Sequence, residues 1–265
     1  MHAITTSDRH PHARLRPVLA AEWTKLRTVR ANAVTVAIAV GASITLSVLA
    51  VTGQRSAWVT MTPQERRDFD PVSLALVGVI LTTLIIGSFA VRTITAEHST
   101  GMVRTTFTAM PHRLGVLVAK GTLVVAVGIS VALVSNAVSF ALGQGILAPT
   151  GASVAIGDPG AVRAIVLGAV GVGLFAAIAI SLGTILRRAT TANIVLVLLV
   201  VGGQLVGTAL PEGARTYLPS AALEALVTTN RTGDTLHPTT ALLVLAAAAA
   251  VMLVIAGHTI TRRDP

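Results

Sequence analysis

Residues 164–211 read AIVLGAVGVGLFAAIAISLGTIL-RR-ATTANIVLVLLVVGGQLVGTALP, and this stretch decides the fold. Two runs of 23 residues without a charged side chain flank Arg187 and Arg188. A membrane-spanning helix needs about 20 apolar residues, because the hydrocarbon core of a bilayer is roughly 30 Å thick. The stretch therefore predicts two spans, with the two arginines in a tight turn outside the hydrocarbon.

Four more windows without charge lie outside this stretch, at 31–54, 71–91, 121–157 and 235–261. A window of about 21 residues in an average soluble protein would hold about five charges. The window 121–157 is too long for one span, and its glycines and Pro149 predict a helix end near residue 145. None of the windows has the polar face that a helix of a soluble bundle shows. We therefore predict an all-α polytopic membrane protein with six transmembrane helices, at about 31–52, 71–91, 115–145, 164–186, 189–211 and 238–261.

The composition of the 265 residues excludes several other classes of protein. Charged residues make up 12% of the chain and hydrophobic residues 53%, whereas soluble domains carry about 25% charged residues. An ordinary soluble enzyme and a disordered chain are both excluded. The sequence has no cysteine, which excludes disulfides, thiolate nucleophiles and Cys-ligated metal centres.

The distribution of basic residues predicts the orientation of the spans. With the N-terminus inside, the inside segments carry 14 of the 20 Lys and Arg residues and a net charge of +10, and the outside segments carry −1. Basic residues favour cytoplasmic loops, so we predict that both termini are cytoplasmic. Residues 1–14 are expected to be a disordered tail, and 15–265 a single transmembrane domain. The basic charge needs no nucleic-acid partner, and no basic–aromatic pattern supports one.

An amphipathic helix is predicted just before the first span. Its apolar face is formed by Leu15, Val18, Leu19, Trp23, Leu26 and Val29, and Arg16 and Arg27 lie away from that face. Such a helix lies along the inner leaflet of the membrane. Glu22 lies on the apolar side, where a carboxylate needs a partner. The sequence leaves two candidates open: Lys25 one turn away, or Arg104 or Arg113 of the next cytoplasmic loop.

The cytoplasmic loop 92–113 contains signals for two helix ends and an apolar segment between them. Gly101 suits the end of the second span, and Pro111 suits the first turn of the next helix. A short helical piece is expected between them. Its side chains Met102, Val103 and Phe107 are too apolar for a free loop, so we predict that they contact a partner protein.

The chain resembles permease subunits of ABC-2 type transporters, in particular the small six-span actinobacterial ones. The resemblance rests on the motif from Glu22 to Arg27 (Glu-Trp-x-Lys-Leu-Arg) and on the order of elements that follows it. The loop itself carries Glu97-x3-Gly101-x2-Arg104-Thr105-x5-Pro111-x-Arg113 and closes on Ala119-Lys120. The resemblance covers nearly the whole chain from residue 20.

The resemblance implies an ABC-2 type permease fold, a location in the bacterial inner membrane and a separate ATP-binding subunit. The loop around 101–110 would be the coupling helix that docks into that subunit, and Arg187-Arg188 would make a second, minor contact. A second permease copy or paralogue would complete the pathway. The outer loop 212–237 would hold a re-entrant helix, which 219–227 fits with Ser220 as its N-cap. The residues implied in ATPase coupling are Glu97, Gly101, Met102, Val103, Arg104, Thr105, Phe107, Pro111, Arg113, Arg187 and Arg188, and those of the interfacial helix are Glu22, Trp23, Lys25, Leu26 and Arg27.

Motifs that are missing from the sequence agree with an external energy source. No Gly-Lys pair is present for a phosphate-binding loop, so ATP and magnesium are expected on the partner subunit and no cofactor on this chain. The predicted span cores hold no ionisable residue, which disfavours ion-coupled secondary transport. No catalytic or metal-binding motif is found, so we expect no enzymatic activity.

The sequence therefore predicts the permease subunit of an ATP-driven exporter whose cargo is amphipathic or lipid-like. A membrane scaffold or sensor that recruits a cytosolic partner without transport is the alternative. Small residues at Gly203-x3-Gly207, and at Gly168, Gly171 and Gly173, predict close helix approach. This approach is either intramolecular or between subunits.

Overall fold

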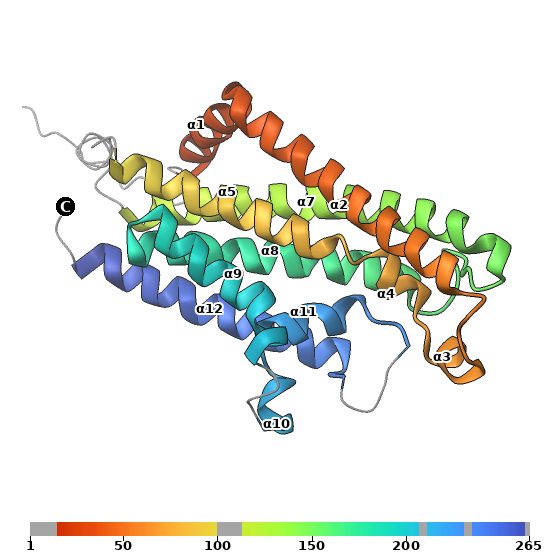
Figure 1. Cartoon of the computed structure of the whole chain (residues 1–265). Coiled ribbons are helices and arrows are strands. Elements are labelled where there is room, and N and C mark those ends of the chain that lie inside the picture. Colours follow the sequence, from red (N-terminus) through yellow and green to blue (C-terminus); the bar gives the residue numbers. More distant parts are fainter. Residues whose placement is uncertain (1–14, 100–112, 207–210, 231–234, 263–265) are drawn as a thin grey trace, which may run out of the picture.

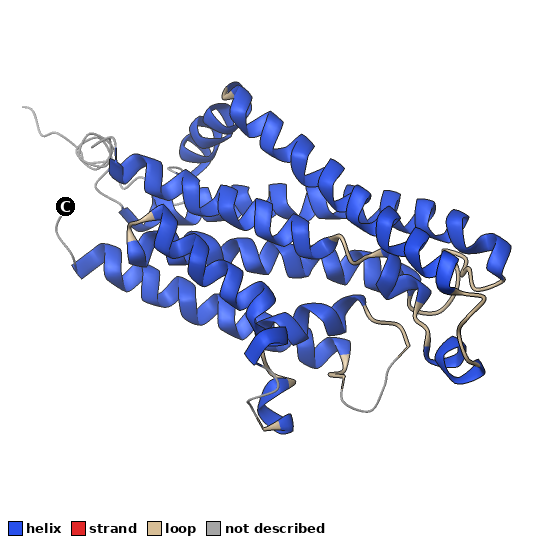
Figure 2. Ribbon diagram, in the orientation of Figure 1, coloured by secondary structure: helices blue, strands red, loops and turns tan. Residues whose placement is uncertain are grey.

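The computed structural model describes residues 15–99, 113–206, 211–230 and 235–262 of the chain. Within these residues the structure consists of helices and short loops and contains no strand (Figure 2). Five of the helices are long and apolar enough to cross a membrane: α2 (Arg30–Ala57), α5 (Val79–Ser99), α7 (Arg113–Leu147), α8 (Ala161–Leu186) and α12 (Pro238–Arg262). The chain is therefore a helical, polytopic membrane protein by the length and composition of its helices.

The described part of the sixth predicted span is α9 (Ala189–Val206), an apolar helix of 18 residues. Its apolar stretch is shorter than those of the other five helices. Residues 207–210, which would continue this span toward residue 211, lie outside the described residues. Five helices long enough to cross are thus found where the sequence predicted six.

The window 71–91 holds two helices instead of the single helix predicted for it. α4 (Pro71–Ala75) and α5 are separated at residues 76–78. Ser47 of α2 accepts a hydrogen bond from the Gly78 N–H at 3.0 Å, and the hydroxyls of Ser43 and Thr82 lie 2.5 Å apart. A Cβ at position 78 would collide with the Ser43 carbonyl, so only glycine allows this close approach. The Ser47 hydroxyl thus satisfies the backbone N–H of Gly78 where the helix is interrupted.

The long helices run roughly side by side, and their ends gather into two groups (Figure 1). One group holds α1 (Leu15–Thr28), the last turn of α5, the first turn of α7, the α8–α9 turn and the end of α12. We call this the α1 end. The short helices α3 (Pro63–Asp68), α4, α10 (Glu212–Arg215) and α11 (Pro219–Val227) lie away from it. The elements at the α1 end are those that the basic residues predict to be cytoplasmic.

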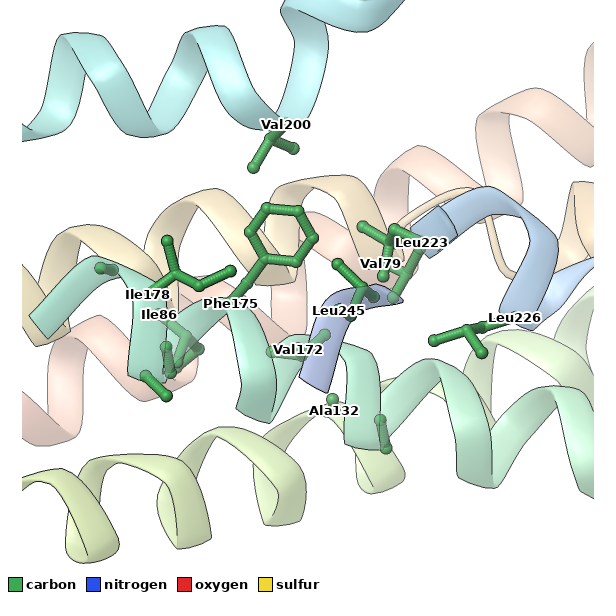
Figure 3. Packing of buried hydrophobic residues seen from close by; sticks show 14 of the residues in the cluster. Val79, Ile86, Ala132, Val172, Phe175, Ile178, Val200, Leu223, Leu226 and Leu245 are labelled. Carbon is green, nitrogen blue, oxygen red and sulfur yellow. The ribbon is translucent and has the colours of Figure 1, made fainter. Parts of the chain in front are cut away.

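Helix α8 forms the centre of the bundle. It packs against α5, α7, α9, α11 and α12, and Phe175 at its middle is fully buried. Figure 3 shows Phe175 pointing toward Val200 of α9, within a cluster that also includes Ile86 of α5 and Leu245 of α12. The side chains of this cluster are apolar throughout, and 78% of the apolar window of α8 is buried, the highest share among the five long helices. Its exposed side chains, Val162 and Val166, lie in its first two turns.

Glycines explain how α8 can have so many close neighbours. A Cβ at Gly171 would lie 2.8 Å from a methyl group of Leu223 in α11, and one at Gly173 would lie 2.6 Å from Ile129 in α7. Gly168 faces Val227 in the same way, and Gly203 of α9 meets Ser220. These contacts are within one chain, so they answer the open question for these four glycines: their close approach is intramolecular. Gly207 lies outside the described residues.

Buried hydroxyl groups in the long helices bond mainly to their own backbone. Thr83, Ser135 and Thr184 each donate to the carbonyl four residues earlier, at 2.7 to 2.9 Å. Because each hydroxyl is bonded to its own helix, it needs no partner on another helix. Ser43 and Ser47 of α2 are exceptions, since they bond to Thr82 and Gly78. The buried amide of Asn136 in α7 also bonds between helices, donating to the carbonyl of Ile165 in α8 at 3.2 Å.

Candidate functional site

The candidate site is the α1 end, where most of the residues singled out by the sequence are located. Helix α1 forms over 15–28 as predicted and packs on α7. Leu19 and Leu26 are half-buried, whereas Trp23 is 49% exposed and Arg27 is exposed. One side of α1 therefore faces the bundle, and its tryptophan remains outside, as an aromatic residue at a membrane interface does.

A buried ion pair joins α1 to α7. The Lys120 Nζ lies 2.7 Å from the Glu22 Oε2, and the two side chains are 5% and 7% exposed, respectively. Glu22 is thus held on the apolar side of its helix by a partner that neither sequence candidate named. Arg104, and the side chains of Lys25 and Arg113, lie outside the described residues. The sequence offered one signal, since Lys120 is one of only two lysines and lies at the edge of an apolar window.

Hydrogen bonds extend this connection from α1 to α2 and α5. The Asn32 side chain in α2 donates to the carbonyl of Leu26 at 3.0 Å, which covers an open carbonyl near the end of α1. Arg92 of α5 donates to the Asn32 side chain at 3.4 Å and to the Thr35 hydroxyl at 3.2 Å. Sequence analysis identified neither Asn32 nor Arg92 as a site residue. Their contacts make α1, α2, α5 and α7 one connected unit at this end.

Helices α5 and α7 lead into and out of the predicted coupling loop. α5 continues to Ser99, with Glu97 in its last turn, and α7 begins at Arg113. At 1.5 Å per residue the 35 residues of α7 span about 52 Å, well beyond roughly 30 Å of hydrocarbon. The side chain of Glu97 and the remaining residues of the loop lie outside the described residues: Gly101, Met102, Val103, Arg104, Thr105, Phe107 and Pro111.

The arginine turn lies next to the last turns of α5. Arg187 adopts a left-handed conformation (φ 56°), and its N–H bonds to the carbonyl of Gly183 at 3.0 Å. A Cβ at Gly183 would lie 2.6 Å from the Ile94 side chain and 3.3 Å from the Val91 Cα. Arg187 and Arg188 are both exposed. The structure therefore places this turn beside the last turns of α5, the helix that leads into the predicted coupling loop.

The helix predicted over 219–227 in the outer loop is present with these bounds as α11, but its N-cap differs from the prediction. Its N-cap is Leu218, with Pro219 in the first turn, and no side chain caps it. Ser220 as N-cap was wrong, because Pro219 already supplies the first helical residue and needs no N–H partner. Ser220 instead lies against Gly203 of α9. α11 packs on α8, α9 and α12.

The described residues contain no group of three or more His, Cys, Asp or Glu side chains that could hold a metal ion. The chemistry available at the α1 end is therefore that of a surface with exposed arginines above a buried ion pair. Such an arrangement can bind and orient a partner. Comparison of the chain with models of known protein families gives no match, and comparison with curated proteins gives none either.

Proposed function

We propose that the chain is the membrane-spanning permease subunit of an ATP-driven ABC-2 type exporter, with an ABC-2 fold. The proposal is supported above all by the α1 end. There, two helices lead into one apolar loop. α7 is tied to the interfacial helix α1 by a buried ion pair, and α5 is connected to α1 through the hydrogen bonds of Arg92 and Asn32. A docked protein that pulled on the loop would therefore move α5, α7 and α1 together.

The length and continuity of α7 make it suited to carry such a movement. It is one unbroken helix of 35 residues from the loop to the opposite end of the bundle. Its close packing on α8 at Gly173 would pass a rotation of α7 directly to the central helix. Packed interfaces of this kind shift between discrete arrangements instead of deforming continuously.

The proposed topology has six spans, with both termini in the cytoplasm of a bacterial inner membrane. Helix α9, at 18 residues, is about 27 Å long at 1.5 Å per residue, which is close to the thickness of the hydrocarbon core. ATP and magnesium would bind to the separate ATP-binding subunit. A second permease copy or paralogue would pair with this chain around the pathway.

The cargo proposed is amphipathic or lipid-like. Most buried hydroxyls along the long helices, such as those of Thr83, Ser135 and Thr184, are satisfied within their own helices, so the helix faces are largely apolar. A charged solute would have to leave water without compensating partners, at a cost of several kcal/mol for an ion. A drug, a peptide or a lipid with an apolar part fits such a surface better.

The test is affinity purification of the tagged chain from its native membrane in mild detergent, followed by mass spectrometry. We expect a soluble subunit with a phosphate-binding loop in stoichiometric amount. Phe107→Asp should remove that subunit, because a carboxylate cannot occupy an apolar cleft. Val59→Asp is the matched control, since Val59 is 84% exposed in the loop before α3, away from the α1 end.

Two results would contradict the proposal. One is a co-purified partner without a nucleotide-binding motif, which would favour the scaffold or sensor. The other is loss of the ATP-binding subunit in both Phe107→Asp and Val59→Asp. That result would contradict the assignment of the loop as the docking site of this subunit. Crosslinking in intact membranes before extraction prevents detergent from removing a weakly bound subunit.

A further inference from the structure

Asp70 joins two parts of the chain that are distant in sequence. Its Oδ1 accepts hydrogen bonds from the N–H groups of Val72 and Ser73, both at 3.0 Å, and so caps α4. Its Oδ2 accepts from the N–H groups of Thr229 at 2.5 Å and Asn230 at 2.8 Å. The Thr229 hydroxyl donates to Oδ1 at 2.7 Å. One carboxylate thus serves both α4 and the segment that directly follows α11.

The segment after α11 also has hydrogen bonds to α8 and α3. Arg163 of α8 donates to the carbonyl of Thr228 at 2.8 Å, and the Asn230 side chain donates to the carbonyl of Arg67 at 3.1 Å. Gln144 of α7 donates to the carbonyl of Pro71 at 3.1 Å and accepts from the Val154 N–H at 2.8 Å. α4 is therefore fixed to α7, and through Asp70 the end of α11 is fixed to α4.

We propose that Asp70, Thr229 and Asn230 form a releasable clasp that holds α11 against the bundle, with Asp70 as its positioning residue. Hydrogen bonds to a carboxylate are about twice as strong as neutral ones, and the three bonds that Thr229 and Asn230 donate to Asp70 depend on one charge. α11 otherwise packs mainly on α8, α9 and α12. Release of the clasp frees the end of α11 from α4, so α11 is then held only by its packing on α8, α9 and α12 and by the bond from Arg163, and it leaves the bundle more readily.

The role of this movement in export rests on the proposed function, whereas the contact itself does not. In an exporter, the clasp closes the end of the bundle opposite the α1 end until α4 and α11 separate. The test uses the purified chain without nucleotide or partner. Failure of the clasp is therefore distinguishable from failure of the permease proposal.

The absence of native cysteines allows a single-cysteine test. The probe is Ala225→Cys in α11, at a position that is 3% exposed, and the reagent is a membrane-impermeant maleimide applied in detergent. Asp70→Asn is the test variant. Asn caps a helix about as well as Asp, but its amide group cannot accept from both Thr229 and Asn230 while the oxygen caps α4. Asp68→Asn is the matched control, because Asp68 is exposed and accepts from Gln64.

We expect Asp70→Asn to accelerate labelling at position 225 by about tenfold, the effect of losing the bonds to one charged acceptor. Thr229→Val removes one of the three bonds to this segment and should give an intermediate rate, and Asp68→Asn should give the parental rate. A second probe, Ala179→Cys in the fully buried part of α8, reports global unfolding. The clasp is refuted if Asp70→Asn and Asp68→Asn label position 225 at equal rates. Equal acceleration at 179 and 225 also refutes it, since the opening would then be global.

Discussion

The pair Glu22–Lys120 is the contact on which the geometry of the α1 end depends. Both charges are almost completely removed from water, so their desolvation is compensated only by each other and by further polar contacts. Removing one partner leaves an uncompensated buried charge, which typically costs about 3–5 kcal/mol. Replacing both with apolar residues of similar size removes the charge and its cost together. The pair therefore matters more for fixing α1 on α7 than for net stability.

A mutant cycle tests this at the level of single residues. We expect Glu22→Leu to lower the thermal unfolding midpoint of the purified chain by several degrees, and Lys120→Met to do the same. The double variant should recover most of the loss. Asp68→Leu, which changes an exposed carboxylate, should have an effect within about 0.5 kcal/mol. If the double variant were destabilised by the sum of the two single effects, the two side chains would not be coupled.

Sequence reasoning could identify Glu22 as a residue that needs a partner, but not which residue that partner is. The amphipathic pattern places the carboxylate on an apolar face, and this requires a cation nearby. Lys120 is 98 residues away in the chain. Which cation pairs with Glu22 depends on how α1 packs on α7, and no local sequence pattern encodes that packing. Asn32 and Arg92 were missed for the same reason, since each acts across an interhelical contact.

At the level of elements, the charge-free windows predict where helices occur, and glycine explains how they pack. Charged residues are costly in hydrocarbon, so they occur where a span ends and a loop begins. The position of α8 and of its turn at Arg187 therefore follows directly from the sequence. The break at residues 76–78 does not. The window 71–91 has no charged side chain at which a break could be expected, and the interruption depends on Ser43 and Ser47 of α2 lying against Gly78. Composition alone cannot place hydroxyls on a neighbouring helix.

Helix α9 is the element that decides between five and six spans. If α9 crosses the membrane, an exposed residue in its first turn and an exposed residue after its end lie on opposite faces. We expect Thr190→Cys and Ala214→Cys to react with an impermeant maleimide from opposite sides of sealed vesicles. Thr60→Cys, in the loop after α2, should react from the same side as Ala214→Cys. Reaction of positions 190 and 214 from the same side would contradict six spans.

For the whole molecule, the two ends of the bundle have different chemistry. The α1 end carries a buried ion pair, exposed arginines and the helices that enter the coupling loop. The other end is held together by hydrogen bonds around Asp70 and Gln144. Charge counting predicts this polarity, because basic residues concentrate on one side of the spans. The contacts that connect the ends through α7 and α8 emerge only from the packed structure.

The most direct test of the central claim identifies what touches the coupling loop in the membrane. A photoreactive phenylalanine analogue replaces Phe107 in the full chain, and the protein is irradiated in native membranes. We predict one dominant crosslinked product, formed with a soluble chain that binds ATP, and no such product when the analogue replaces Val59. Crosslinks from position 107 only to lipid, to this chain or to a partner without a nucleotide-binding site would contradict the ATP-driven permease.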